Sequence, residues 1–444
     1  MSAVAVEKDV YRLAFDRLFD PGETGWLRER RTAAISRFVE KGFPGPRDEA
    51  WRHTPIGPLT RNRWEPAAPS APPAAEALAA LAPPEMSGLR AVLAGGRLVP
   101  ELSRLDGGRG VEVQGLASAL RSRPDELEPH LGRIAGDDAN AFSELNTAFA
   151  VDGVVITVEP GAVLEDPLHV IHVAAPDEGS AVLSCPRLLV VAGRGSQCRV
   201  VETYLGPSGA PHLTSAVTEV VVGDNASVDH YKLQREDPGA FHVATLAARL
   251  GRDARFADRS FTLGAAIGRN DIDVRFEGEG GECRLDGLFV VDGERLSDTH
   301  SRVDHARPHC SSHEHYKGVL DGRARGVFHG LVVVRPGAQK TDASQMNRNL
   351  LLSREALVHS TPQLEILADD VKCRHGSTTG QLDPAALFYL RSRGIGETEA
   401  RSLLTWAFAS DIVLGLPVPA LRETLTGYLR RLLPGSAILG EAVA

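Results

Sequence analysis

The central part of the chain alternates short β-branched runs with turns that contain glycine. The first clear run is Val154–Val158, and turn-like segments then begin at Gly193, Gly223, Gly251 and Gly278, at intervals of 30, 28 and 27 residues. No apolar pattern of helical period separates these segments. A unit of this length cannot bury its apolar face alone, so successive units must stack on one another.

Two architectures are compatible with stacked strands. A β-sandwich would place a turn roughly every 8–12 residues, whereas a parallel β-helix repeats a coil of several strands at a longer, fixed period. The interval of almost 30 residues favours a mainly β fold built as a parallel β-helix. Its terminal coils would expose strand edges, so we expect helical segments on both sides to cap them.

Helical patterns flank this repeat and divide the chain into three predicted domains. Residues 1–150 are predicted to be mostly helical, 151–382 to form the β-helix, and 383–444 to form a C-terminal helical domain. The Pro/Ala-rich run at 65–84 is predicted to be a loop or linker. Helices are expected at 20–41, 115–122, 138–149 with Asp138 as its cap, 385–393, 397–414 and 417–433.

Composition limits the classes of function. The 444 residues carry a formal net charge of -9, so no basic surplus is available for a nucleic-acid partner. No apolar run is long enough to span a membrane, and the N-terminal residues show no signal-peptide pattern, so we expect a cytoplasmic protein. The 5 cysteines are scattered and form no CxxC pair, which argues against a disulfide framework or a zinc finger.

One short segment places a thiol close to an imidazole where the pattern changes from strand to helix. If the chain is extended from Val371, Cys373 and His375 lie on one face, at a spacing that can share a soft metal ion. The same spacing also fits a buried structural cysteine beside a surface histidine.

A second candidate is the histidine-rich segment 300–315. On a strand, His309, His313 and His315 would share one face and Cys310 with Glu314 the other, so neither face collects a closed zinc set. We interpret the segment as structural. The alternative is a stand-alone metal or carbohydrate enzyme that uses this strand, since β-helix folds also host such enzymes. Its metal-capable residues are His300, Asp304, His305, His309, Cys310, His313, Glu314 and His315.

The last third of the chain carries the most specific motifs, which are Arg325–Gly330, Ala338–Ala343, Asn347–Ser353, Pro362–Ile366, Ala368–Gly376 and Leu387–Ile395. Through these motifs the chain resembles the SufB/SufD family of iron-sulfur cluster assembly proteins. Weaker similarity, including the Glu49–Thr54 cluster, extends over essentially the whole chain. The Cys373-x-His375-Gly376 pattern resembles the SufD type, where the SufB type has Glu-His-Glu.

The resemblance implies a non-enzymatic scaffold with a right-handed β-helix. In the family, SufB and SufD pair through their β-helices, and each C-terminal helical domain docks a SufC ATPase. The histidine at the position of His375 is linked to assembly of a transient cluster shared with SufB, and Cys373 is a candidate further ligand. No phosphate-binding loop is present, so we expect no nucleotide on this chain. A SufB-like paralogue, a homodimer of the isolated chain and a flavin in the complex stay open.

The residues expected to contribute to SufC docking lie in the predicted C-terminal helices. Their apolar stripe fits either self-packing or a partner protein. They are Phe388, Tyr389, Arg391, Arg393, Gly394, Leu404 and Phe408.

Overall fold

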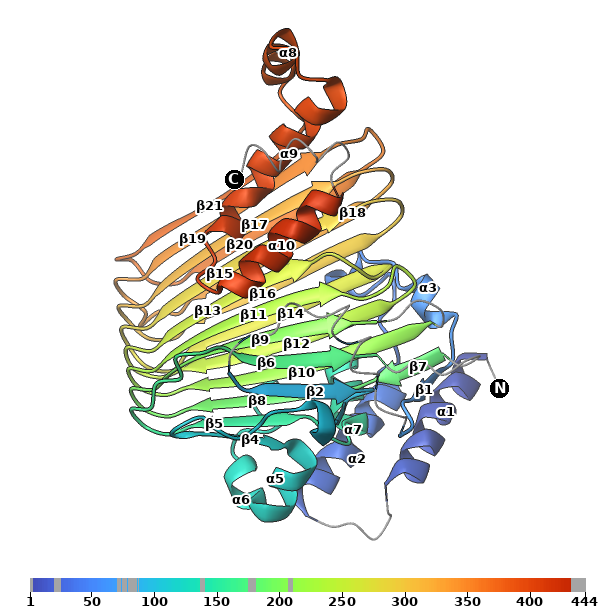
Figure 1. Cartoon of the computed structure of the whole chain (residues 1–444). Coiled ribbons are helices and arrows are strands. Elements are labelled where there is room, and N and C mark those ends of the chain that lie inside the picture. Colours follow the sequence, from blue (N-terminus) through green and yellow to red (C-terminus); the bar gives the residue numbers. More distant parts are fainter. Residues whose placement is uncertain are drawn as a thin grey trace.

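The dominant feature of the molecule is a parallel β-helix made of two long sheets (Figure 1). The computed structural model describes residues 3–19, 25–69, 73, 78, 86, 88–135, 140–174, 181–206 and 211–432. From β8 onward successive strands alternate between the sheets, and the first sheet ends at β20 and the second at β21. The mainly β, parallel β-helix architecture predicted from the repeat is confirmed.

Both sheets are ladders of mostly parallel strands. The first sheet contains β4 (Val111–Gly115), β5 (Val154–Val158), β8 (Arg187–Ala192), β10 (His212–Val222), β12 (Phe241–Leu250), β14 (Ile267–Phe276), β16 (Leu296–His305), β18 (Arg325–Val334) and β20 (Leu357–Ile366), with β1 (Trp64–Pro66) and β7 (Ala181–Ser184) beside them. The second contains β3 (Arg97–Leu98), β2 (Arg90–Ala94), β6 (Leu168–Val173), β9 (Gln197–Leu205), β11 (Ser227–Arg235), β13 (Arg255–Thr262), β15 (Glu282–Val291), β17 (Ser311–Leu320), β19 (Asp342–Leu351) and β21 (Lys372–Gly380).

The turns between strands stack because one residue in each adopts a left-handed conformation. Asn225, Asp253 and Gly280 have φ of 56°, 54° and 73° at equivalent places in consecutive coils. The N–H of Asn225 donates to Arg252 O, and that of Asp253 to Glu279 O, both at 2.8 Å. Glycine, asparagine and aspartate tolerate this conformation best, which is why the repeat is visible in the sequence.

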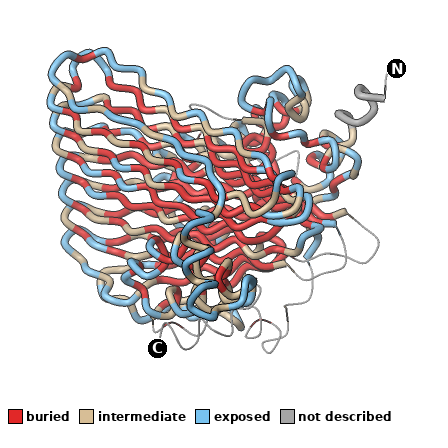
Figure 2. Tube along the Cα trace, turned by 90° about the horizontal axis from the view of Figure 1, so that it is seen from above, coloured by how far each residue is buried: buried red, intermediate tan, exposed pale blue. Residues whose placement is uncertain are grey.

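Most residues of the β-helix strands before the last coil are buried (Figure 2), and their inward-facing side chains form its interior. At one side of the interior these side chains are apolar and stack coil upon coil. Val228 and Phe256 are register partners in this column, and both are buried. Burial of each such side chain stabilises the fold by roughly 1.5–3 kcal/mol. The other side of the interior is polar, and it leads to the candidate site.

The N-terminal region packs an aromatic cluster against the first sheet. Its helices are α1 (Ala3–Leu18), α2 (Trp26–Lys41), α3 (Gly57–Thr60), α5 (Leu116–Ser122), α6 (Pro124–Leu127) and α7 (Ala141–Phe149), with 3-10 turns at Glu49–Trp51 and Pro100–Leu102. Phe15, Phe38 and Phe142 are buried in one cluster that also includes residues of the first sheet.

Several predictions for this region need correction. Helix α1 is missing from the sequence prediction, although Tyr11, Phe15 and Phe19 recur every fourth residue and are buried. The cap of α7 is Asn140, whose side chain accepts from the N–H of Phe142, and Asp138 lies outside the described residues. The run at 65–84 begins within strand β1, and most of it lies outside the described residues.

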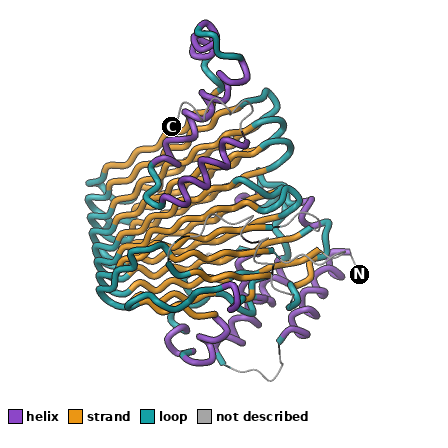
Figure 3. Tube along the Cα trace, viewed as in Figure 1, coloured by secondary structure: helices purple, strands orange, loops and turns teal. Residues whose placement is uncertain are grey.

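The C-terminal helices follow their predicted ranges closely (Figure 3). They are α8 (Pro384–Ser392), α9 (Glu397–Leu414) and α10 (Pro419–Leu432). Helices α9 and α10 pack against the outer face of the second sheet. Trp406 and Val413 of α9 and Leu421 of α10 share one apolar cluster with Tyr231 and Leu288 of the sheet. The expectation that these helices cap the last coil is therefore wrong, because their apolar face covers the side of the β-helix.

Candidate functional site

Strand β21 is the last strand of the β-helix and carries the predicted thiol and imidazole. Cys373 pairs in register with Ala343 of β19, and His375 pairs with Gln345. The side chain of Cys373 packs partly against the interior apolar core, so it faces inward. Because strand side chains alternate, His375 faces the same way. Burial raises the pKa of the Cys373 thiol.

The last coil is open. Strand β21 pairs with β19 on one side, and on the other side no described residue forms a neighbouring strand in the sheet. Positions that are buried in earlier coils are therefore accessible here: Glu314 and Gln345 are buried inside the β-helix, whereas His375 is exposed. Exposed apolar side chains also gather along and after β20. They are Leu357, Ile366 and Leu367.

A row of amides forms the floor beneath this coil. Gln345, Asn347 and Asn349 alternate along β19 and are all buried. The hydroxyl of Ser360 donates to Asn347 Oδ1 at 2.8 Å, and the hydroxyl of Ser377 donates to Ser360 Oγ at 2.8 Å. Sequence reasoning missed this floor, although a polar residue at every second strand position could have revealed it.

The histidine-rich segment is divided among several environments. His309 occupies a left-handed turn with φ 61°, so its predicted place on a strand with His313 and His315 is wrong. His313 and His315 do share the outer face of β17, and Glu314 is buried inside. Burial lowers the pKa of His305 to about 4. In the described part of the chain, no three metal-binding side chains converge.

The remaining metal-capable residues of the segment are also engaged within the fold. Asp304 is buried and accepts hydrogen bonds from Arg335, and Cys310 is buried. His300 lies over His329 with ring centroids 5.0 Å apart, and its Nε2 is 3.1 Å from Asp298. The structural interpretation of this segment stays a prediction.

The predicted docking residues divide into two groups. On α8 and the turn after it, Phe388 is 74% and Tyr389 57% exposed, and α8 has no buried residue. The guanidinium of Arg393 lies 5.2 Å from the Tyr389 ring centroid, Arg391 pairs with Glu397, and Gly394 has φ 87°. On α9, Leu404 is half-buried. The ammonium nitrogen of Lys317, in the β-helix, lies 4.8 Å from the ring centroid of Phe408. Helix α8 is thus the freely presented element.

Comparison with known proteins places the chain in a family. The family model described as "SUF system FeS cluster assembly, SufBD core domain" matches residues 173–408, and "SufBD protein N-terminal region" matches 9–170. The chain belongs to the SufBD family. It is 32% identical to an iron-sulfur cluster assembly SufBD family protein of Synechocystis over 95% of this chain and 94% of that protein. It is 31% identical to the iron-sulfur cluster assembly protein SufD of Escherichia coli over 91% and 92%, respectively.

This SufBD family member also contains a buried charged network that sequence reasoning missed. Glu202 accepts hydrogen bonds from Tyr204 and Thr218 and contacts the Nε2 atoms of His172 and His230 at 2.9 and 2.8 Å. The other ring nitrogen, Nδ1, of His230 lies 2.6 Å from Asp258. Burial by itself lowers the pKa of His230, but the two carboxylates outweigh burial and raise this pKa to about 9. His230 is therefore a buried imidazolium.

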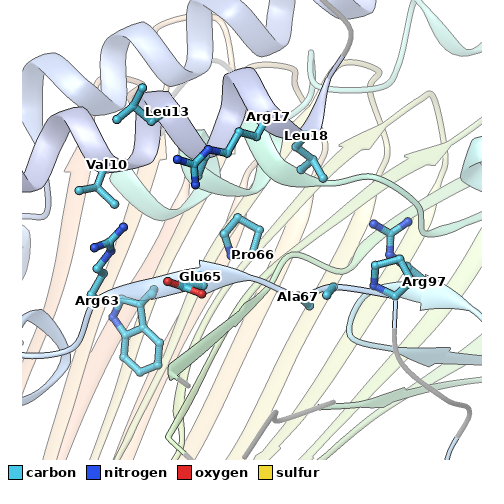
Figure 4. A pocket seen from close by; sticks show the side chains of 13 residues that line it. Val10, Leu13, Arg17, Leu18, Arg63, Glu65, Pro66, Ala67 and Arg97 are labelled. Carbon is cyan, nitrogen blue, oxygen red and sulfur yellow. The ribbon is translucent and has the colours of Figure 1, made fainter. Parts of the chain in front are cut away.

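A surface cavity of about 330 Å³ lies between α1 and β1, far from the last coil (Figure 4). Val10, Leu13 and Leu18 form an apolar wall, and Arg17 with Arg63 lines the rim. None of the predicted site residues lines this cavity. Among the helices that the structure describes, none is both long and apolar enough to cross a membrane.

Proposed function

We propose that this SufBD family member is the SufD-type subunit of an iron-sulfur cluster assembly scaffold and has no enzymatic activity of its own. It pairs with a SufB-type partner at the last coil, and the cluster under assembly is cargo held between the two chains. The observation that carries the proposal is the open strand β21, where Cys373 and His375 face the same way and no further strand from the described part of the chain covers them.

The donor set suits iron but is incomplete. A thiolate and an imidazole nitrogen are common ligands of iron in iron-sulfur centres. The raised pKa of Cys373 keeps the thiol protonated near neutral pH, so binding of iron would release its proton. Two ligands cannot complete a cluster, so a second chain must supply the others. The SufD type is preferred because SufD proteins are among the relatives and because Cys373-x-His375-Gly376 is present.

Cluster loading of the complex tests the shared site. The chain is co-expressed with SufB and SufC partners, purified as a complex, and loaded anaerobically with iron and sulfide. We expect His375→Ala to abolish the visible absorption of the cluster and Cys373→Ser to reduce it. His313→Ala is the matched control, because His313 is an exposed histidine on the outer face of the same sheet. Full loading of His375→Ala would overturn the shared site.

We further propose that α8 docks the SufC ATPase. A truncation at Asp383 would also remove α9 and α10, which cover Tyr231 and Leu288 of the β-helix. The double variant Phe388→Ser/Tyr389→Ser is therefore a cleaner test, because it changes only exposed side chains. We expect it to abolish pull-down of SufC, while Val163→Ser, at another exposed apolar residue, retains it. Undiminished capture by the double variant would refute docking through α8.

A further inference from the structure

The buried side chain of Gln345 has one satisfied and one unsatisfied end. Its Nε2 donates to Glu314 Oε1 at 2.9 Å, while its Oε1 is buried and has no hydrogen-bond partner among the described residues. Gln345 is only 2% exposed. Buried acceptors without a donor are uncommon in native proteins, so we expect a hydrogen-bond donor within reach of Gln345 Oε1.

The orientation of the Gln345 amide follows from what lies beneath it. Glu314 is fully enclosed, and its second carboxyl oxygen, Oε2, interacts with the hydroxyl of Ser301. A carboxyl oxygen facing an amide calls for the NH₂ end of that amide, because two acceptors would repel. The carbonyl end of Gln345 is consequently the end left over for another donor.

His375 is the neighbour placed to supply that donor. It pairs in register with Gln345, and adjacent strands lie about 4.8 Å apart. Both side chains project toward the interior, and the imidazole is exposed, so no packing prevents it from turning toward Gln345. A neutral imidazole has one N–H to donate and keeps its other nitrogen free as a ligand.

We propose that Gln345 is a positioning residue for His375, which donates one ring N–H to Gln345 Oε1. The inference rests on the proposed role of His375 as a cluster ligand. Ligand histidines commonly give their second N–H to a carbonyl or carboxylate, which fixes the tautomer and the direction of the free nitrogen. Gln345 donates to Glu314, and Ser301 also donates to Glu314, so contacts within the preceding coils fix the orientation of the Gln345 amide.

The tautomer of His375 in the full-length chain tests this contact without any cluster. The protein is labelled with ¹⁵N-histidine, and the His375 resonances are assigned by their loss in His375→Ala. In Gln345→Met, which keeps the length of the side chain but removes the acceptor, we expect the tautomer ratio to change about fivefold, as for a hydrogen bond of average net strength.

Asn349 provides a matched control. It is buried in the same strand and its Oδ1 also has no hydrogen-bond partner in the described part of the chain, but Asn349 pairs in register with Thr379. Asn349→Leu should therefore leave the His375 resonances unchanged. Identical His375 tautomer ratios in the wild type and Gln345→Met would overturn the inference, and so would a change of equal size in Asn349→Leu, which would indicate general loosening of β19.

Cluster loading of the complex separates this inference from the proposed function. If both hold, Gln345→Met should weaken iron retention by about tenfold to a hundredfold, as is typical for loss of a residue that orients a ligand. If His375→Ala abolishes loading while Gln345→Met changes neither tautomer nor loading, the proposed function stands and the inference fails. If His375→Ala loads normally, the proposed function fails, and the tautomer measurement still decides whether Gln345 holds His375.

Discussion

His230 and His375 occupy the same inward column of the second sheet, yet they differ in almost every property. The column runs from β11 to β21 through successive register pairs. His230 is buried and lies between Glu202 and Asp258, which keep it charged. His375 is exposed at the end of the column. The residue type and the strand position are the same, so the covering coil and the two carboxylates around His230 make the difference.

The comparison teaches that inward positions of the second sheet are buried in the earlier coils and accessible in the last coil. In the earlier coils, an inward polar side chain must find partners, because an unpaired buried charge is costly. In the last coil the same direction leads to an accessible surface, where a side chain can keep its coordination positions free. Substitutions at the two histidines should therefore have opposite consequences.

The largest effect on stability is expected for His230→Leu. This change leaves Glu202 and Asp258 buried without their shared cation, and removal of one partner from a buried ion pair costs roughly 3–5 kcal/mol. Urea denaturation followed by circular dichroism measures the loss. His375→Leu is the counterpart in the same column and should change stability by less than about 0.5 kcal/mol. Similar losses for both variants would contradict the comparison.

The pH dependence of stability sharpens the same point. The pKa of His230 is raised from 6.5 to about 9 in the folded protein. Its stabilising contribution is fully present below pH 6.5 and is lost as the pH rises through about 9, because the folded state then releases the proton that the unfolded state has already lost. The difference in unfolding free energy between wild type and His230→Gln should shrink over this range.

The neighbouring Lys232 titrates nearby and needs a control. Burial lowers its pKa to about 8, but Lys232 is present in both proteins, so its direct contribution largely cancels in the difference. Denaturation curves at several pH values measure the effect. If the difference in unfolding free energy stayed constant from about pH 6 to about pH 9.5, His230 would not be the charged partner.

An intermediate effect is expected where the C-terminal helices meet the β-helix. The buried ammonium of Lys317 donates to Phe408 O at 2.8 Å and to the Asp411 carboxylate at 2.6 Å. Lys317→Met removes both bonds but keeps the apolar stem, so we expect a loss of roughly 1–3 kcal/mol. Hydrogen exchange should increase in α9 and α10 while the interior of the β-helix stays protected. Unchanged exchange in α9 would mean that the apolar face alone holds the helix.

The smallest effect on stability is expected at the other site residue, Cys373. Cys373→Ser replaces a half-buried thiol by a hydroxyl of similar size at an open coil, and should cost less than about 0.5 kcal/mol. Its cluster loading should nevertheless fall. A large drop in the melting temperature of this variant would show that Cys373 contributes mainly to packing.

The sequence revealed those parts of the fold that repeat. Asn225, Asp253 and Gly280 occupy left-handed turn positions that few residue types accept, so the repeat is visible in the sequence over these consecutive coils. The placement of Cys373 and His375 on one face of their strand followed from the alternation of strand side chains. By contrast, the network around Glu202 joins strands that are far apart in sequence, and no local pattern reports such contacts.

Two other features depend on the three-dimensional register. Gly287 looks like a weak strand residue, but a Cβ there would lie 2.4 Å from the Tyr316 ring of the next coil, so this glycine provides the space for that ring. The position of the C-terminal helices was mispredicted because an apolar stripe shows that a helix is covered, but not which surface covers it. The three-domain division stays a prediction.

The open coil also determines where the molecule comes apart. In a linear stack each coil is held by its two neighbours, and the terminal coil by only one. We therefore expect fraying to begin at β20 and β21, the strands that carry the candidate ligands and the exposed apolar residues. A partner that closes this end would act as the missing neighbour, and by mass action the melting temperature would rise with its concentration. The melting temperature would then be a property of the assembly, and the isolated chain would melt at a lower temperature than the complex.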